Sequence, residues 1–316
     1  MKRYRYVNIV FLLTIGIRFL AEAIPFGLFV NNLISLLVIS QIILIIPSVV
    51  YLYTTKQNYR SAVGFNKLSV ANLGLLVVFT LCITPIMTLV NAFSRQYSVD
   101  ATTNTMSNIA TQNPFLVSLV CIAVIPAIFE ESVYRGIFYQ EYRKINPFGA
   151  IFFSALLFGM MHGNLNQFTY AFVMGIIMAI VIEATDSILS TMVIHFMTNG
   201  MSVVLLYALP KLDENYEKLL EQASEVSKES FLSLLQAYGV RALIGGVIGV
   251  LVLVRIARNS NRLEHVKHIF RRKTMEERTA CPPIRALLTL PLVIAIVMSM
   301  INIVFNELAL RGLIHL

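Results

Sequence analysis

The chain has few charged residues, and their scarcity excludes an ordinary soluble domain. Asp, Glu, Lys and Arg make up 13% of its 316 residues, whereas charged residues make up about 25% of a typical soluble protein. Hydrophobic residues account for 57% of the chain, and its mean hydropathy is +0.74. We therefore expect an all-α polytopic membrane protein.

Cysteine is also scarce, and familiar hydrolase motifs are missing. Cys82, Cys121 and Cys281 are odd in number and widely spaced, so they indicate neither a disulfide framework nor a zinc ribbon. The sequence contains no H-E-x-x-H pair and no serine nucleophile elbow. Any hydrolytic chemistry must therefore come from other residues.

Apolar stretches long enough to cross about 30 Å of hydrocarbon predict about nine transmembrane helices. Their approximate bounds are 7–28, 32–54, 70–94, 114–138, 147–163, 166–184, 187–208, 239–256 and 283–306. We expect the first stretch to remain as a span instead of acting as a cleaved signal peptide, because Arg18 interrupts it. Arg18 and Glu22 are four residues apart, and we expect them to neutralise each other.

The net charge of +8 follows a membrane topology and does not indicate nucleic-acid binding. With the N-terminus in the cytoplasm, eighteen Lys and Arg residues fall on the inner side, six fall on the outer side, and one lies within a span. This asymmetry predicts a cytoplasmic N-terminus and an extracellular C-terminus in the cell membrane. Between the spans, we expect an extracellular amphipathic helix at 211–237 and a basic cytoplasmic loop at 258–280.

Two adjacent carboxylates and an arginine lie inside the fourth predicted span. An ionised side chain at the membrane centre costs at least about 2.5–3.5 kcal/mol, so such residues usually have a function. In a helix, Glu131 and Arg135 lie on one face, in the favoured order of acid before base. Glu130 then points about 100° away. We expect Arg135 to neutralise Glu131 and leave Glu130 free for chemistry.

Three more polar residues lie in the neighbouring apolar spans: His162, and the pair His195 and Asn199, which share one helical face. A helix bundle can bring such groups into one cavity. Glu130 would take a proton from water while His162 orients that water. His195 and Asn199 would donate hydrogen bonds to the oxyanion formed when the water attacks an amide carbonyl.

Other interpretations of the same residues remain open. Two histidines and a carboxylate form a familiar zinc set, although we favour metal-free hydrolysis without a cofactor. A buried His or Asn often only joins helices, and a Glu pair can relay protons or cations in a transporter. A transporter is disfavoured because the sequence lacks inverted repeats and Gly/Pro-broken helix pairs.

The three motifs, Glu130-Glu131-x-x-x-Arg135, Phe158-x-x-x-His162 and His195-x-x-x-Asn199, occur in this order on successive spans. Together they resemble the CAAX prenyl protease and bacteriocin-processing family, also called CPBP or Abi, over residues of about 114–208.

This resemblance implies a glutamate-dependent intramembrane endopeptidase with a CPBP-type core bundle, in which Glu130 and His162 activate water and His195 and Asn199 stabilise the oxyanion. Glu131 and Arg135 would be supporting residues. The short loops suggest a bacterial member, for which a prenylated substrate is not expected.

We therefore divide the chain into N-terminal helices (1–113), a catalytic core (114–208) and a C-terminal part (209–316). That last part would hold the amphipathic segment, the basic loop and two more helices. The expected partners are the lipid bilayer and a membrane-associated peptide or protein substrate. The alternative is a non-catalytic scaffold that binds an envelope enzyme or a sensor kinase.

One difficulty is the depth of the site residues in the membrane. Counting residues from the span ends places His162 deeper than Glu130 and His195 by nearly a third of the bilayer.

Overall fold

The computed structural model describes residues 3–22, 32–100, 102–212, 228–271 and 282–314, and all its regular elements within these ranges are helices. The α-helices are α1 (Arg3–Glu22), α2 (Leu33–Thr54), α3 (Tyr59–Ala62), α4 (Val70–Ser94), α5 (Thr103–Gln112), α6 (Phe115–Leu119), α7 (Ile125–Glu131), α8 (Tyr139–Arg143), α9 (Pro147–Met161), α10 (Leu165–Thr185), α11 (Ile188–Leu212), α13 (Lys228–Asn259), α14 (Leu263–Phe270) and α16 (Leu290–Leu310). Two π-helical segments, η2 (Val120–Val124) and η3 (Ser132–Phe138), and a 3₁₀ turn, η4 (Ile284–Leu287), complete the described elements. The predicted all-α fold is confirmed.

Eight of the described helical segments are long and apolar enough to cross a membrane, close to the nine predicted from the sequence. The difference is α9, which has 15 residues. At 1.5 Å per residue it is about 22 Å long, shorter than a hydrocarbon core of about 30 Å. α13 is longer than the predicted stretch 239–256, since its apolar part already begins at Phe231. The chain is a multi-pass membrane protein.

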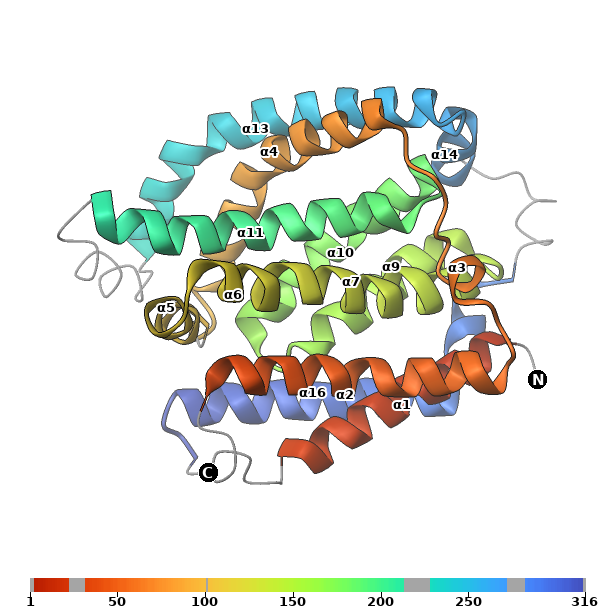
Figure 1. The fold of residues 1–316 in the computed structure, drawn as a ribbon, viewed down its shortest axis with the longest axis horizontal. Helices are drawn as coiled ribbons and strands as arrows, with labels where there is room; N and C mark the ends of the chain where they lie inside the picture. Colours follow the sequence, from red (N-terminus) through yellow and green to blue (C-terminus); the bar gives the residue numbers. More distant parts are fainter. Residues whose placement is uncertain (1–2, 23–31, 101, 213–227, 272–281, 315–316) are drawn as a thin grey trace.

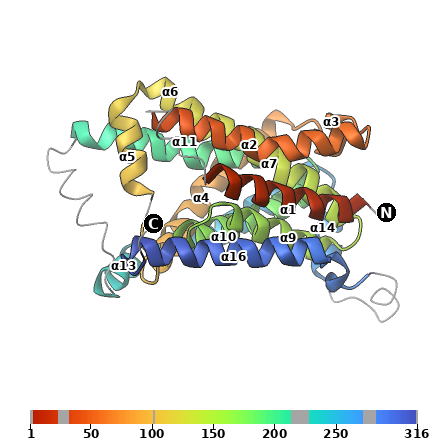
Figure 2. The same cartoon turned by 90° about the horizontal axis from the view of Figure 1, so that it is seen from below.

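The long helices lie roughly along one common direction, and the site is built in the middle of the bundle. Figure 1 shows α4 and α13 side by side along one edge, with α1, α2 and α16 along the opposite edge. The segment that contains α6 and α7 lies between them, in contact with α2 and α11. The view in Figure 2 places α2 and α11 on one side of the molecule and α13 and α16 on the other. The predicted catalytic core (114–208) is therefore enclosed by helices from both ends of the chain.

Polar caps position the ends of the helices that carry the site. The Asn146 side chain accepts a hydrogen bond from the backbone of Gly149, with Pro147 in the first turn of α9. Asn164 caps α10 in the same way, and Gly163 between the two helices has a φ of 71°, which glycine adopts without steric cost. α9 therefore begins at Pro147, where the predicted stretch 147–163 also begins.

The two predicted extramembrane segments are only partly described. Within 211–237, residues 213–227 lie outside the described residues, and α13 already begins at Lys228. Within 258–280, residues 272–281 lie outside the described residues, but α14 is a helix and not a loop. Arg262 and His265 both contact the Glu183 carboxylate at the end of α10. This part of the basic segment is therefore attached to the bundle.

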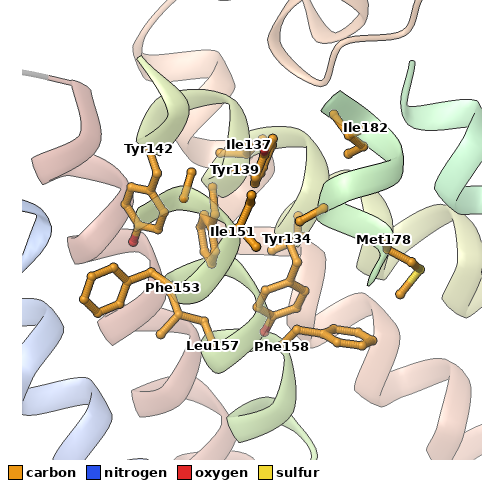
Figure 3. Close-up of a cluster of buried hydrophobic side chains, with 14 of the residues drawn as sticks. Tyr134, Ile137, Tyr139, Tyr142, Ile151, Phe153, Leu157, Phe158, Met178 and Ile182 are labelled. Atoms are coloured by element: carbon orange, nitrogen blue, oxygen red, sulfur yellow. The ribbon is translucent and has the colours of Figure 1, made fainter. Parts of the chain in front are cut away.

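The apolar core lies between α9, α10 and the segment η3–α8. Its labelled members are Tyr134, Ile137, Tyr139, Tyr142, Ile151, Phe153, Leu157, Phe158, Met178 and Ile182 (Figure 3). Tyr134 and Phe158 face each other from neighbouring helices, with ring centroids 5.5 Å apart. Aromatic pairs at this separation and in edge-to-face geometry contribute about 0.5–1.5 kcal/mol beyond their burial. This core fixes the helix that carries the two carboxylates against α9.

Candidate active site

The carboxylates lie on a helix that is interrupted by two π-helical segments. Glu130 and Glu131 are the last residues of α7, and Arg135 lies in the following segment η3. A π-helical segment contains one extra residue per turn and often occurs at functional sites. It changes the direction of the side chains that follow it, which sequence periodicity alone does not predict.

Glu131 and Arg135 form a completely buried ion pair. The Arg135 Nη1 atom lies 3.2 Å from Glu131 Oε1, and both side chains have no exposed surface. The Arg135 guanidinium also lies over the Phe158 ring, 3.8 Å from its centroid. Such a cation–π contact in a desolvated place contributes about 2 kcal/mol or more. The structure therefore confirms the predicted pairing of Glu131 with Arg135.

His195 connects the two carboxylates. Its Nδ1 atom lies 2.9 Å from Glu131 Oε1, and its Nε2 atom lies 3.8 Å from Glu130 Oε2. Because an ionised carboxylate only accepts hydrogen bonds, Nδ1 carries the proton and donates a hydrogen bond to Glu131. In the neutral imidazole, Nε2 is then an acceptor facing Glu130. Glu131 thereby orients His195, a contact that the sequence analysis did not predict.

Glu130 is separated from the ion pair and is bound by a residue of α2. Its side chain is 6% exposed, and its Oε1 atom accepts a hydrogen bond of 2.8 Å from Gln41 Nε2. The sequence analysis missed Gln41. Gln41 is the only side-chain amide in the stretch Leu33–Thr54, and a lone amide in an apolar span is the signal that points to it.

His162 lies directly after α9 and is half-buried. Its Nδ1 atom is 2.9 Å from the backbone oxygen of Phe158, so Nδ1–H donates and Nε2 is left as an acceptor. The Phe158 ring centroid lies 5.1 Å from the ring of His162 and 6.0 Å from the ring of His195. The two histidines thus flank one aromatic ring.

Asn199 lies one turn after His195 on α11 but has a different partner. Its Nδ2 atom donates to the backbone oxygen of Ile122 at 3.0 Å, within the π-helical segment η2. This bond joins α11 to the helix that carries the carboxylates. One N–H of the Asn199 amide is used here, and the second is still able to donate.

Arg18 of α1 also reaches the site from outside the predicted core. Its Nη2 atom lies 3.5 Å from the backbone oxygen of His162. The Glu22 side chain lies outside the described residues, so the predicted Arg18–Glu22 pair stays a prediction. The contact shows that α1 helps to hold the end of α9.

A search of the described residues finds no group of three or more His, Cys, Asp or Glu side chains arranged to hold a metal ion. Glu130, Glu131 and His195 lie close together, but Glu131 also contacts Arg135. A guanidinium beside a carboxylate competes with a cation for it. These contacts describe a chain of polar groups that runs from Arg135 through Glu131 and His195 to Glu130.

Comparison with known proteins agrees with this geometry. Residues 112–201 match the family model described as Rce1-like, type II CAAX prenyl endopeptidase. This range contains all three motifs but excludes Gln41 and Arg18. Neither the curated proteins nor the solved structures contain a significant match to the chain. Residues 112–201 of this chain are therefore similar to the Rce1-like type II CAAX prenyl endopeptidases, a family of peptide hydrolases.

Proposed function

We propose that this chain is a metal-independent endopeptidase that cleaves a membrane-associated peptide or protein with water activated by Glu130. The observation that carries the proposal is the unequal environment of the two adjacent carboxylates. Arg135 compensates the charge of Glu131 at 3.2 Å, whereas Glu130 faces the ring of His195 at 3.8 Å. One carboxylate is thus structural, and the other is available to accept a proton.

The gap between Glu130 and His195 suits a water molecule. The distance of 3.8 Å between Oε2 and Nε2 is too long for a direct hydrogen bond. Both atoms accept hydrogen bonds when the imidazole is neutral, so one water is able to donate to both. A general base must lie within about 2.6–3.2 Å of the proton donor, directly or through one water. Glu130 Oε2 satisfies this condition for a water held beside His195.

The proposed reaction uses this water as the nucleophile. The water oxygen forms a bond to the carbonyl carbon of the scissile amide while its proton passes to Glu130. The tetrahedral intermediate then collapses, the C–N bond breaks, and Glu130 returns the proton to the leaving nitrogen. His162, with Nε2 as an acceptor, orients this water or shares its proton. The free N–H of Asn199 stabilises the oxyanion, and His195, whose Nε2 is an acceptor in this geometry, holds the water beside Glu130.

The proposed topology has a cytoplasmic N-terminus and an extracellular C-terminus. The two termini lie at opposite ends of the bundle in Figure 1, and α14 lies at the end where the N-terminus lies. The proposed topology places most of the Lys and Arg residues of the sequence on the cytoplasmic side. Reporter fusions at each terminus test this assignment, since a cytoplasmic C-terminus would contradict it.

The first experiment compares the wild type with Glu130→Gln and His195→Ala in native membranes. Mass spectrometry scores the termini of peptides and small proteins, and immunoblotting measures the amount of each variant. Glu141→Gln is the matched control, because Glu141 is a buried carboxylate on the following helix that pairs with Lys144. We expect the same termini to disappear in both test variants and to persist in the control.

A scaffold that binds a membrane enzyme or a sensor kinase is the competing proposal, since Asn199 and Phe158 also make structural contacts. In that case both well-expressed variants leave all termini unchanged and still complement the loss of the gene. This result would overturn the catalytic proposal.

A further inference from the structure

Among the described residues outside the family-matched segment, Gln41 has the only polar side chain that hydrogen-bonds to the proposed catalytic carboxylate of Glu130. It lies near the middle of α2, and its Nε2 donates to Glu130 Oε1 at 2.8 Å. α2 precedes the matched residues 112–201 by more than fifty residues. The bond therefore joins a flanking helix to the reacting end of the site.

Ordinary helix–helix attraction does not account for this amide. Gln41 Oε1 is buried and has no hydrogen-bond partner among the described residues. A buried acceptor without a donor costs about 1–3 kcal/mol, so an apolar side chain at this position would give a more favourable helix contact. The amide is oriented so that its N–H points to the carboxylate, and its own oxygen is left without a hydrogen bond in the part of the chain that the structure describes.

The other charged and titratable groups around Glu130 do not hold its Oε1 atom. Glu131, Tyr134 and Arg135 follow on the same helix, and Arg135 is bound to Glu131. His195 of α11 faces the opposite carboxylate oxygen, Oε2. His162, after α9, donates to the Phe158 backbone. Within the described residues, Gln41 supplies the only hydrogen bond at 3.5 Å or less that the Glu130 carboxylate accepts.

We propose that Gln41 is a positioning residue for the reaction, acting through Glu130; this inference rests on the function proposed above. Its N–H holds Oε1, which fixes the rotation of the carboxylate and directs Oε2 to the water site beside His195. A donor also stabilises the ionised carboxylate, the form that accepts a proton. The flanking helix α2 thus completes a site whose proposed catalytic residues come from residues 112–201.

The test replaces Gln41 with methionine, which keeps the length of the side chain but removes the donor. Ser40→Met is the matched control, because Ser40 is the preceding residue on α2, is exposed and bonds only to the backbone of its own helix. Cells express equal amounts of each variant, and mass spectrometry follows the rate at which Glu130-dependent termini accumulate. A hydrogen bond to a charged group corresponds to a rate change of about 10- to 100-fold. We expect this decrease for Gln41→Met and less than a twofold change for the control.

A second readout separates positioning from a structural role. The amount of uncleaved substrate protein that co-purifies with the Gln41→Met variant is compared with the amount that co-purifies with Glu130→Gln. We expect retention to be equal in both, since positioning affects turnover and leaves binding intact. Cleavage at the wild-type rate would overturn the inference, as would a parallel loss of cleavage, retention and thermal stability. If Glu130→Gln leaves every terminus unchanged, the proposed function itself is wrong and the inference is overturned with it. That outcome is visible in the Glu130→Gln sample alone.

Discussion

The buried pair of Glu131 and Arg135 makes a prediction about stability that is independent of any substrate. Both side chains have no exposed surface and lie 3.2 Å apart. Replacing Arg135 with methionine leaves the Glu131 charge in the core without its positively charged partner, next to the hydrogen bond from His195. Breaking a buried pair in this way costs about 3–5 kcal/mol, because the remaining charge is uncompensated. The variant also loses the contact of the guanidinium with the Phe158 ring.

A double variant separates the charge from the loss of packing. In Glu131→Gln/Arg135→Met, no formal charge is left unpaired at these two positions, and the remaining loss comes mainly from the contact with Phe158. We therefore expect the double variant to be more stable than Arg135→Met alone. The two substitutions would then be strongly non-additive, as expected for residues in direct contact.

Thermal unfolding of the purified protein in detergent is the assay. A loss of about 3–5 kcal/mol lowers the Tm by the order of 10 °C in a chain of this size. Glu130→Gln serves as the control for a carboxylate outside the ion pair, and we expect its Tm to stay close to that of the wild type. Unfolding of Arg135→Met at the wild-type temperature would contradict this prediction, as would a double variant that loses the sum of both single effects.

Three further predictions concern the site and the packing around it. Asn199→Ala should reduce cleavage by about 10²–10³-fold if Asn199 stabilises the oxyanion, while unfolding measurements should show only the small loss of an interhelical bond, about 0.6 kcal/mol; a decrease confined to stability would assign Asn199 to structure alone. Incubation of membranes with a strong chelator should leave the rate of Glu130-dependent cleavage unchanged, and a loss that added zinc restores would contradict a metal-independent reaction. Gly175→Ala should lower the Tm because its Cβ would lie 2.8 Å from the Ala155 backbone of α9, whereas Gly16→Ala, which meets nothing within 4 Å, should have no destabilising effect; equal Tm values for the two variants would show that α9 and α10 separate easily.

The class of fold and most residues of the candidate site follow from the sequence alone. Long apolar runs predict spans because backbone polar groups in lipid must be bonded within a helix. Charged residues inside such runs stand out because their burial is costly. For this reason Glu130, Glu131 and Arg135 are visible without a structure. Their spacing also predicts the ion pair, because a separation of four residues brings two side chains to one face.

Only the tertiary structure decided how the remaining groups face each other. The contact of His195 with Glu131 joins two helices, and no spacing along the chain encodes it. The π-helical segments change the direction of side chains in the middle of a span, and α9 ends before His162. Gln41 is separated from Glu130 by 89 positions in the chain. Contacts of this kind depend on the packing of helices far apart in sequence, and periodicity describes only one helix at a time.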